Sequence, residues 1–319
     1  MRTRALLWAF VAAFALLLAL AVNWALRLGL PPALQPQPGD LAINPEGTII
    51  ARTGGALPGK TVIWYRISDA KNVHSSPNGV ADIPHLIVRN TTICVWSPYG
   101  QISVFDAERP SQVVHLQARS FGNVALSPSG RLLAYEIETP YSVAVAAWRS
   151  GKTVAAIPGR LDSLCFMSED AIAYWGDVGA QPLSMYNYKD DTNTKTTTGH
   201  AFHLTPLFGS QGVVYSDHSE GRYDRFDMFR WVWGREPERL FSWQSEDPRP
   251  VAVEGGILLT EHPQFFRPWR LQAVLVDMRG TPIRRFSFSS PVVRICTDRT
   301  GKFVYGLSED GSVLQASTD

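Results

Sequence analysis

The chain has 319 residues, of which 45% are hydrophobic and 18% charged, and its formal net charge is +1. So few charges among so many apolar residues argue against a disordered chain, and the near-neutral balance gives no electrostatic basis for binding nucleic acid. The 25 glycines and 22 prolines indicate frequent turns rather than a helical bundle.

The first predicted element is a membrane-spanning helix at 5–26, an apolar run with a single clearly polar side chain. As a helix it extends about 33 Å at about 1.5 Å per residue, which is enough to cross a bilayer core of about 30 Å. Arg2 and Arg4 precede it and favour a cytoplasmic N-terminus. We therefore expect residues 1–27 to be a signal anchor with an extracytoplasmic domain behind it. The alternative is a signal peptide cleaved after Ala21, which secretes the remainder.

A proline-rich segment, residues 28–39, follows the predicted helix and favours extended polyproline geometry. We expect it to be a stiff spacer in front of a single domain at 40–319. Without the arginines of the anchor, this domain carries slightly more acidic than basic residues. Its net charge therefore gives no reason to expect attraction to an anionic membrane or polymer.

From residue 40 onward the chain repeats a pattern of short apolar strands and turns. The clearest unit, 123–157, begins with a short strand and a Ser-Pro-Ser-Gly turn at 127–130. Its three further strands are predicted at 131–136, 142–148 and 153–157. No helix fits between them.

Turn glycines set the spacing of the repeat. Gly47, Gly130 and Gly301 each precede an apolar strand, and the last two are separated by four units of about 43 residues. In one unit the pattern is displaced, so that the first turn falls at 89–90 and the second at 97–100. A seventh unit supplies its third strand at 312–316. The spacing is typical of four-stranded propeller blades.

These repeats resemble the WD40-like and related bacterial β-propeller repeat families over 40–319. The family's Trp-Asp dipeptide is only approximated, by Phe-Asp at 105–106 and Val-Asp at 276–277, and its Gly-His pair occurs at 199–200 alone. The resemblance therefore implies a diverged propeller outside the strict WD40 group. We predict an all-β, seven-bladed β-propeller, with a six-bladed ring and a β-sandwich as alternatives.

The predicted ring lacks one strand, because the seventh unit ends after its third. Residues 33–37 precede the first blade, and an outer edge strand tolerates Pro36 whereas a central strand does not. We therefore expect this segment to close the ring.

The residue types that carry chemistry are sparse. No nucleophile elbow, P-loop or zinc-protease motif occurs, and we expect no cofactor and no metal. His200 and His203 form an H-x-x-H pattern, but residues i and i+3 of an extended chain point to opposite faces. The acidic run at 189–193 lacks calcium-loop spacing and is expected to be a hairpin turn.

The three cysteines, Cys94, Cys165 and Cys296, lie far apart in separate apolar runs. We expect them to be buried apolar side chains; the alternative is one disulfide and a spare thiol.

In propellers of the resembled type, loops between second and third strands gather on one face around the central channel. The loop at 216–225 is dense in mixed charge, and the loop at 261–269 carries aromatic side chains between prolines, which suits a binding hot spot. The candidate partner-binding residues are Asp217, His218, Arg222, Asp224, Arg225, Phe265, Phe266 and Trp269. The alternatives are an ordinary solvated loop and aromatics packed beneath their own loop.

The sequence thus predicts a membrane-tethered scaffold without catalytic activity, which binds a protein or polymer through its loop face and does not bind nucleic acid. The alternative is a propeller enzyme of hydrolase, lyase or lactonase type. Such an enzyme would need acidic and histidine side chains to converge in the central channel with a metal.

Overall fold

The computed structural model describes residues 39–54, 61–76, 85–120, 122–137, 142–158, 163–176, 182–196, 201–218, 225–244, 249–261, 271–308 and 310–318. The predicted anchor at 1–27, and the spacer up to Pro38, lie outside these residues. In the described part of the chain, no helix combines the length and apolar character needed to cross a membrane.

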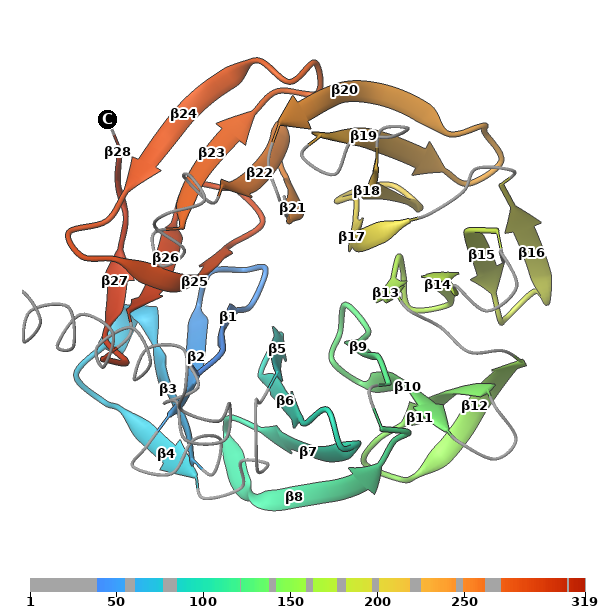
Figure 1. Cartoon of the computed structure of the whole chain (residues 1–319). Helices are drawn as coiled ribbons and strands as arrows, with labels where there is room; N and C mark the ends of the chain where they lie inside the picture. The colour runs from blue at the N-terminus through green and yellow to red at the C-terminus, as the bar shows by residue number, and fades with distance from the viewer. Residues whose placement is uncertain are drawn as a thin grey trace, which may run out of the picture. The chain divides into compact units, whose positions relative to one another are not determined.

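The described strands form seven antiparallel sheets, the blades, set around a common centre (Figure 1). Blade 1 contains β1 (Leu41–Ile43), β2 (Ile49–Gly54), β3 (Thr61–Arg66) and β4 (His74–Ser76), with the short 3-10 helix η1 (Ile67–Asp69) between its last two strands. Blade 2 contains β5 (His85–Arg89), β6 (Thr92–Trp96), β7 (Gln101–Asp106) and β8 (Arg109–Gln117). Blade 3 contains β9 (Val124–Leu126), β10 (Leu132–Ile137), β11 (Ser142–Ala147) and β12 (Lys152–Pro158). Blade 4 contains β13 (Ser163–Phe166), β14 (Ala171–Trp175), β15 (Ser184–Asn187) and β16 (Thr192–Lys195).

The last three blades follow the same order. Blade 5 contains β17 (Phe202–Pro206), β18 (Gly212–His218), β19 (Arg225–Val232) and β20 (Glu238–Gln244). Blade 6 contains β21 (Pro250–Val253), β22 (Gly256–Glu261), β23 (Gln272–Val276) and β24 (Pro282–Ser287), and β28 (Ser317–Thr318) is added at its edge. Blade 7 contains β25 (Val292–Thr297), β26 (Val304–Ser308) and β27 (Val313–Gln315).

Seven sheets confirm the prediction of a seven-bladed propeller, and the six-bladed ring and the β-sandwich are wrong. The displaced unit is also confirmed: Asn90 adopts a left-handed φ of 51° between β5 and β6, and Gly100 adopts φ 81° before β7. The acidic run at 189–193 begins in the predicted hairpin turn between β15 and β16, and its last two residues already belong to β16. Short strands separated by residues that tolerate positive φ therefore define the blades.

The ring closes between blade 7 and blade 1. The N–H of Arg299 donates to the carbonyl of Pro45 at 2.9 Å, and the side chains of Tyr305 and Leu307 pack against Leu41 and Ile43 of β1. Blade 7 has three strands among the described residues, because the chain end crosses to blade 6 and pairs β28 with β24. The closing strand that we expect at 33–37 lies outside the described residues and stays a prediction.

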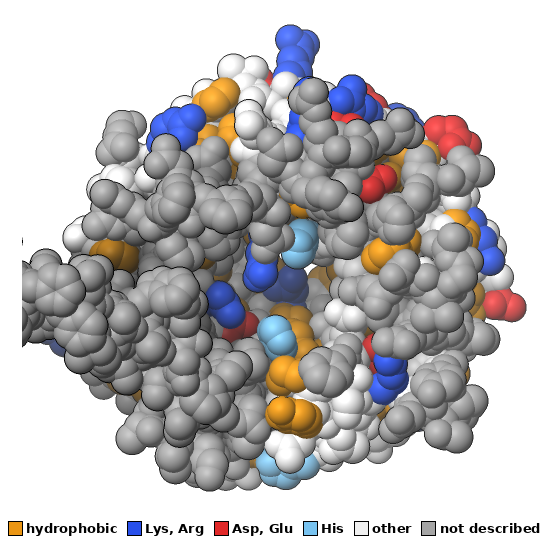
Figure 2. Space-filling model, in the orientation of Figure 1, with side chains coloured by type: hydrophobic (Ala, Val, Ile, Leu, Met, Phe, Trp, Pro, Cys, Tyr) orange, Lys and Arg blue, Asp and Glu red, His pale blue; other side chains and the backbone are white. Residues whose placement is uncertain are grey.

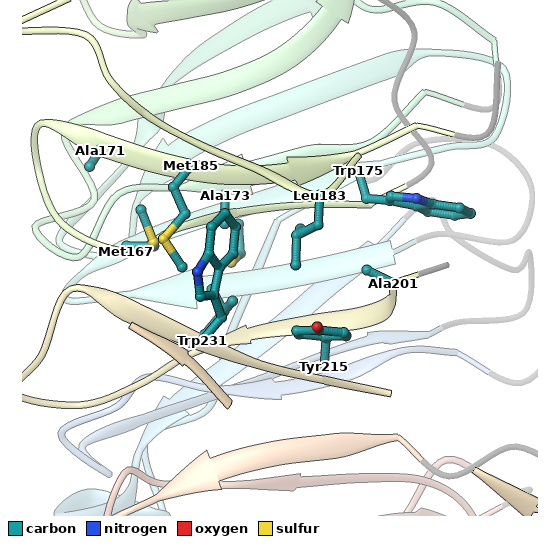
Figure 3. Packing of buried hydrophobic residues seen from close by; sticks show 11 residues of the cluster. Met167, Ala171, Ala173, Trp175, Leu183, Met185, Ala201, Tyr215 and Trp231 are labelled. Carbon is teal, nitrogen blue, oxygen red and sulfur yellow. The ribbon is translucent and has the colours of Figure 1, made fainter. Parts of the chain in front are cut away.

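The hydrophobic core is divided into clusters between neighbouring blades. Figure 3 shows one of them between blades 4 and 5, where Met167 and Met185 of blade 4 approach Trp231 of blade 5. Both faces of a blade are covered in this way, which explains why strands such as Ala171–Trp175 are buried along their whole length.

Gly130 occupies a turn that a side chain would disturb. Its φ is 71°, and a Cβ added there would lie 2.7 Å from the carbonyl oxygen of Arg89 in the neighbouring blade. Gly151 has a similar φ of 68°, but the described structure leaves open space around it. We expect Gly151→Ala to cost about 1 kcal/mol from backbone strain, and Gly130→Ala to cost about 1 kcal/mol more because it also strains the contact. Equal losses in denaturant unfolding would contradict this assignment.

Asp277, from the Val-Asp dipeptide at 276–277, closes its own turn. Its Oδ1 accepts the N–H groups of Arg279 and Thr281, both at 2.8 Å. Chiefly through the Thr281 hydrogen bond, the pKa of Asp277 is lowered from its usual 3.8. The group therefore stabilises the fold fully above pH 3.8, and this stabilisation is lost as the pH falls through the lower, folded-state pKa. Unfolding midpoints between pH 5 and pH 2 should fall less steeply in Asp277→Asn than in the wild type; parallel curves would contradict this.

All three cysteines are described and are free thiols, so the disulfide alternative is wrong. Cys94 and Cys165 are buried as expected, whereas Cys296 is only partly buried. Burial raises the pKa of each thiol above its usual value.

Candidate functional site

The two faces of the ring carry different connections. Because strands run antiparallel and in order, links from second to third strands, and from each outer strand to the next blade, all lie on one face. We call this the loop face; its described parts include 97–100, 118–120, 288–291 and 310–312. The inner strands begin at this face and end at the opposite one.

Of the candidate residues in the charged loop at 216–225, some lie in strands and the others lie outside the described residues. β18 extends through Asp217 and His218, and β19 begins at Arg225, so placing these three residues on a loop was wrong. The hairpin is longer than expected because its pairing continues to His218↔Phe226. Arg222, Asp224, Phe265, Phe266 and Trp269 lie outside the described residues.

The inner strands of blades 2 to 6 surround a cavity of about 360 Å³ in the central channel. Its walls carry both apolar and polar surface, and its described lining includes Arg89, Cys165, His203 and Arg249. Figure 2 shows the central hollow, where Lys or Arg and His side chains lie around the opening and an acidic side chain lies beside one of the basic ones.

Three residues at the loop-face ends of inner strands, together with Arg294 inside β25, form what we call the mouth cluster: Asp40, His85, Arg249 and Arg294. Asp40 accepts the N–H of Leu41 at 2.9 Å through Oδ1 and the N–H of Leu86 at 2.8 Å through Oδ2. Arg294 Nε lies 3.5 Å from Asp40 Oδ1. Asp40 therefore joins blade 1 to blades 2 and 7.

The surrounding protein and the neighbouring charges together set the ionisation of the mouth cluster. Burial raises the pKa of Asp40, although Arg294 and His85 act in the opposite direction. Burial also lowers the pKa of His85, which Asp40 opposes and Arg294 and Arg249 reinforce. The imidazole stacks on Trp96, with ring centroids 5.1 Å apart. Positive charge at the mouth thus comes from the two arginines.

Deeper in the channel, Arg89 lies at the end of β5 farthest from the loop face. One of its guanidinium nitrogens, Nη1, donates to the carbonyl of Val88 at 3.1 Å, and its charge interacts with Glu46 and Cys165. Burial lowers the pKa of Arg89, but a guanidinium stays protonated in proteins. Burial raises the pKa of Cys165 to about 12 despite the nearby arginine, so this side chain is a neutral thiol.

His203 shows how a bulge changes the expected alternation. Its φ is 50°, and the pairing of β17 with β18 shifts register between Phe202 and Thr205. A bulge re-aims side chains, and His203 lines the cavity. His200, its partner in the H-x-x-H pattern, lies outside the described residues, and within the described ranges no three His, Cys, Asp or Glu side chains gather as metal ligands.

The buried acidic residues of the described chain serve the backbone. Glu136 is 1% exposed, accepts the N–H of Asn123 at 3.2 Å and lies 3.8 Å from Arg119. Asp298 is 4% exposed and accepts the N–H of Phe303 at 3.2 Å. Together with Asp40, these carboxylates hold turns and blade junctions.

No family model and no curated protein matches the chain. Similar solved structures include a chain of the mitotic checkpoint complex, at 10% identity and TM-score 0.61, over 88% of this chain and 87% of that one. An oligogalacturonate lyase in complex with manganese matches at 10% identity and TM-score 0.61, over 88% of each chain. The β-propeller domain of Cps50 (Swd1) from Myceliophteria thermophila matches at 9% identity and TM-score 0.63, over 88% of this chain and 96% of that one.

At these identities the likeness shows the fold alone. The chain carries a seven-bladed β-propeller of WD40-like architecture. Its similar structures include a chain of a protein complex, a lyase and a further β-propeller domain.

Proposed function

We propose that this propeller is a binding scaffold without catalytic activity, which holds a protein or polymer partner against its loop face. The observation that carries the proposal is the mouth cluster on the loop face, where Arg249 and Arg294 both act on His85 and Arg249 also lines the cavity. Guanidinium groups around a concave opening suit recognition of an anionic group on a partner.

The chemistry of the ionisable groups supports binding rather than catalysis. The buried carboxylates accept backbone N–H groups, and the thiol in the cavity wall is neutral. A general base or nucleophile needs a pKa near the working pH and a reacting atom within reach, and these groups are committed to structural contacts instead.

The test is capture of partners from native membranes by the full chain. We expect Phe265→Ala with Phe266→Ala to weaken capture without changing the unfolding midpoint. Phe208, which is 39% exposed in the turn between β17 and β18 on the opposite face, provides the control substitution Phe208→Ala. Unchanged capture by the double variant, or equal loss in the control, would count against the loop face.

The N-terminal apolar run motivates a second part of the proposal, in which residues 5–26 anchor the propeller to a membrane with the N-terminus cytoplasmic. Protease added to the extracytoplasmic side should digest the propeller, and deletion of residues 1–27 should leave it in the soluble fraction. A wild-type chain found soluble in the cytoplasm would overturn this placement. A mature chain that begins at Val22 would replace anchoring with secretion.

The cavity itself favours a second candidate function, an enzyme with its site in the channel. A cationic pocket of about 360 Å³ suits an acidic sugar, and one similar structure is an oligogalacturonate lyase. Incubation with oligogalacturonate, with and without Mn²⁺, tests this candidate. New unsaturated sugar ends would support it, and their absence would argue for the binding scaffold instead.

A further inference from the structure

We propose that the central cavity binds a carboxylate carried on an aliphatic group, as at the C-terminal end of a polypeptide, with Arg249 contacting the carboxylate near the loop face and Arg89 adding positive charge from the opposite end. This inference rests on the proposed binding function, because it names the group that a partner inserts into the channel.

The charge of the cavity selects an anion. Its charged lining residues are Arg89 and Arg249, and the described residues that line it include no acidic side chain. Glu46 lies outside this lining and offsets part of the Arg89 charge. Attraction between a guanidinium and a carboxylate is strengthened where protein replaces water, and the planar guanidinium matches the two carboxylate oxygens.

The walls of the cavity indicate which chemical group is attached to the bound carboxylate. Leu164, Leu204 and Val251 line it, and the neutral thiol of Cys165 adds a further weakly polar surface. An aliphatic side chain next to a carboxylate gains from the same walls. The lining therefore offers both apolar and cationic surface to the end of a peptide.

The size and the local strain of the site agree with this assignment. A volume of about 360 Å³ lies at the small end of ligand pockets, so the cavity accommodates the end of a chain rather than a long segment. His203 holds a left-handed φ of 50°, a strained conformation for a residue with a side chain. Such strain clusters at functional sites, and here it occurs at a residue that lines the cavity.

The experiment uses the full chain in detergent and two N-terminally fluorescent Gly-Val-Leu tripeptides, one with a free C-terminal carboxylate and one with a C-terminal amide. Fluorescence anisotropy should show the carboxylate binding at least ~10-fold more tightly than the amide. Arg249→Gln should remove most of this difference, and Arg89→Gln, at the opposite end of the cavity, should reduce it less. Arg131→Gln, an exposed residue in the turn between β9 and β10 on the opposite face, should leave it unchanged.

The unfolding midpoint of each variant is measured in parallel, and Arg249→Gln, at an exposed position, keeps the test valid if Arg89→Gln does not fold. Equal binding of carboxylate and amide would overturn the inference, as would tighter binding of digalacturonate than of the peptide. If the carboxylate peptide does not bind, but the substitutions at Phe265 and Phe266 still weaken partner capture, only this inference is overturned. If these substitutions leave partner capture unchanged, the proposed function is overturned instead.

Discussion

Alanine at Trp231 should lower the free energy of unfolding by about 3–5 kcal/mol, the loss typical of a large aromatic removed from a core. The indole is 1% exposed and packs between blades 4 and 5 beside Met167 and Met185 (Figure 3). Its Nε1 also donates to the carbonyl of Arg235 at 2.7 Å. Substitution therefore leaves both a cavity and a carbonyl without its donor.

Equilibrium denaturant unfolding measures this loss. Val154 lies on the outer strand β12 and is 47% exposed, so Val154→Ala provides a control that should change the free energy by less than about 0.5 kcal/mol. A loss below about 1 kcal/mol for Trp231→Ala would show that the two blades do not depend on this contact.

The second large effect is expected at Asp40, where Asp40→Ala should cost about 2–3 kcal/mol. The substitution leaves the N–H groups of Leu41 and Leu86 without their acceptor, at about 1–3 kcal/mol each. Part of this cost is offset, because burial raises the pKa of Asp40 and its charge is itself unfavourable there.

Asp40→Asn distinguishes the acceptor role from the charge. Asparagine keeps one acceptor oxygen and loses the negative charge, so an intermediate loss is expected if the backbone hydrogen bonds dominate. Should Asp40→Ala unfold at the same denaturant concentration as the wild type, blade 1 would not be held through this residue.

The blades could be predicted from sequence because their signals are local. Gly130 and Gly301 both adopt positive φ in turns at the end of an inner strand, and each is followed by an apolar strand. The turn of the displaced unit could also be predicted, because asparagine, here Asn90, is one of the few residue types that tolerate a left-handed conformation.

Ring closure and the cavity could not be predicted in the same way because they join distant units. Asp40 bonds Leu86 of the next blade and approaches Arg294 of the last one, and no short-range pattern links these positions. Arg89 and Arg294 do carry a weak signal, because each is an arginine within a short apolar inner strand. Only the ring brings them to one channel.

The expectation for the charged loop went wrong for a related reason. Asp217 and His218 are polar, and polar residues in such a run predict a loop. In the structure, however, β18 pairs with β19 along its full length. Asp227, opposite Asp217, accepts from Arg239 at 2.8 Å, so strand pairing tolerates charge near the loop-face ends of β18 and β19.

The central claim, that partners bind on the loop face, is tested most directly by site-specific photo-crosslinking in native membranes. One photoreactive residue replaces Tyr99, which is 57% exposed in the turn between β6 and β7, and another replaces Phe208 on the opposite face. The expected result is a discrete crosslinked product from position 99 that excess wild-type protein competes away, and none from position 208. A competed product from position 208 with none from position 99 would contradict the account.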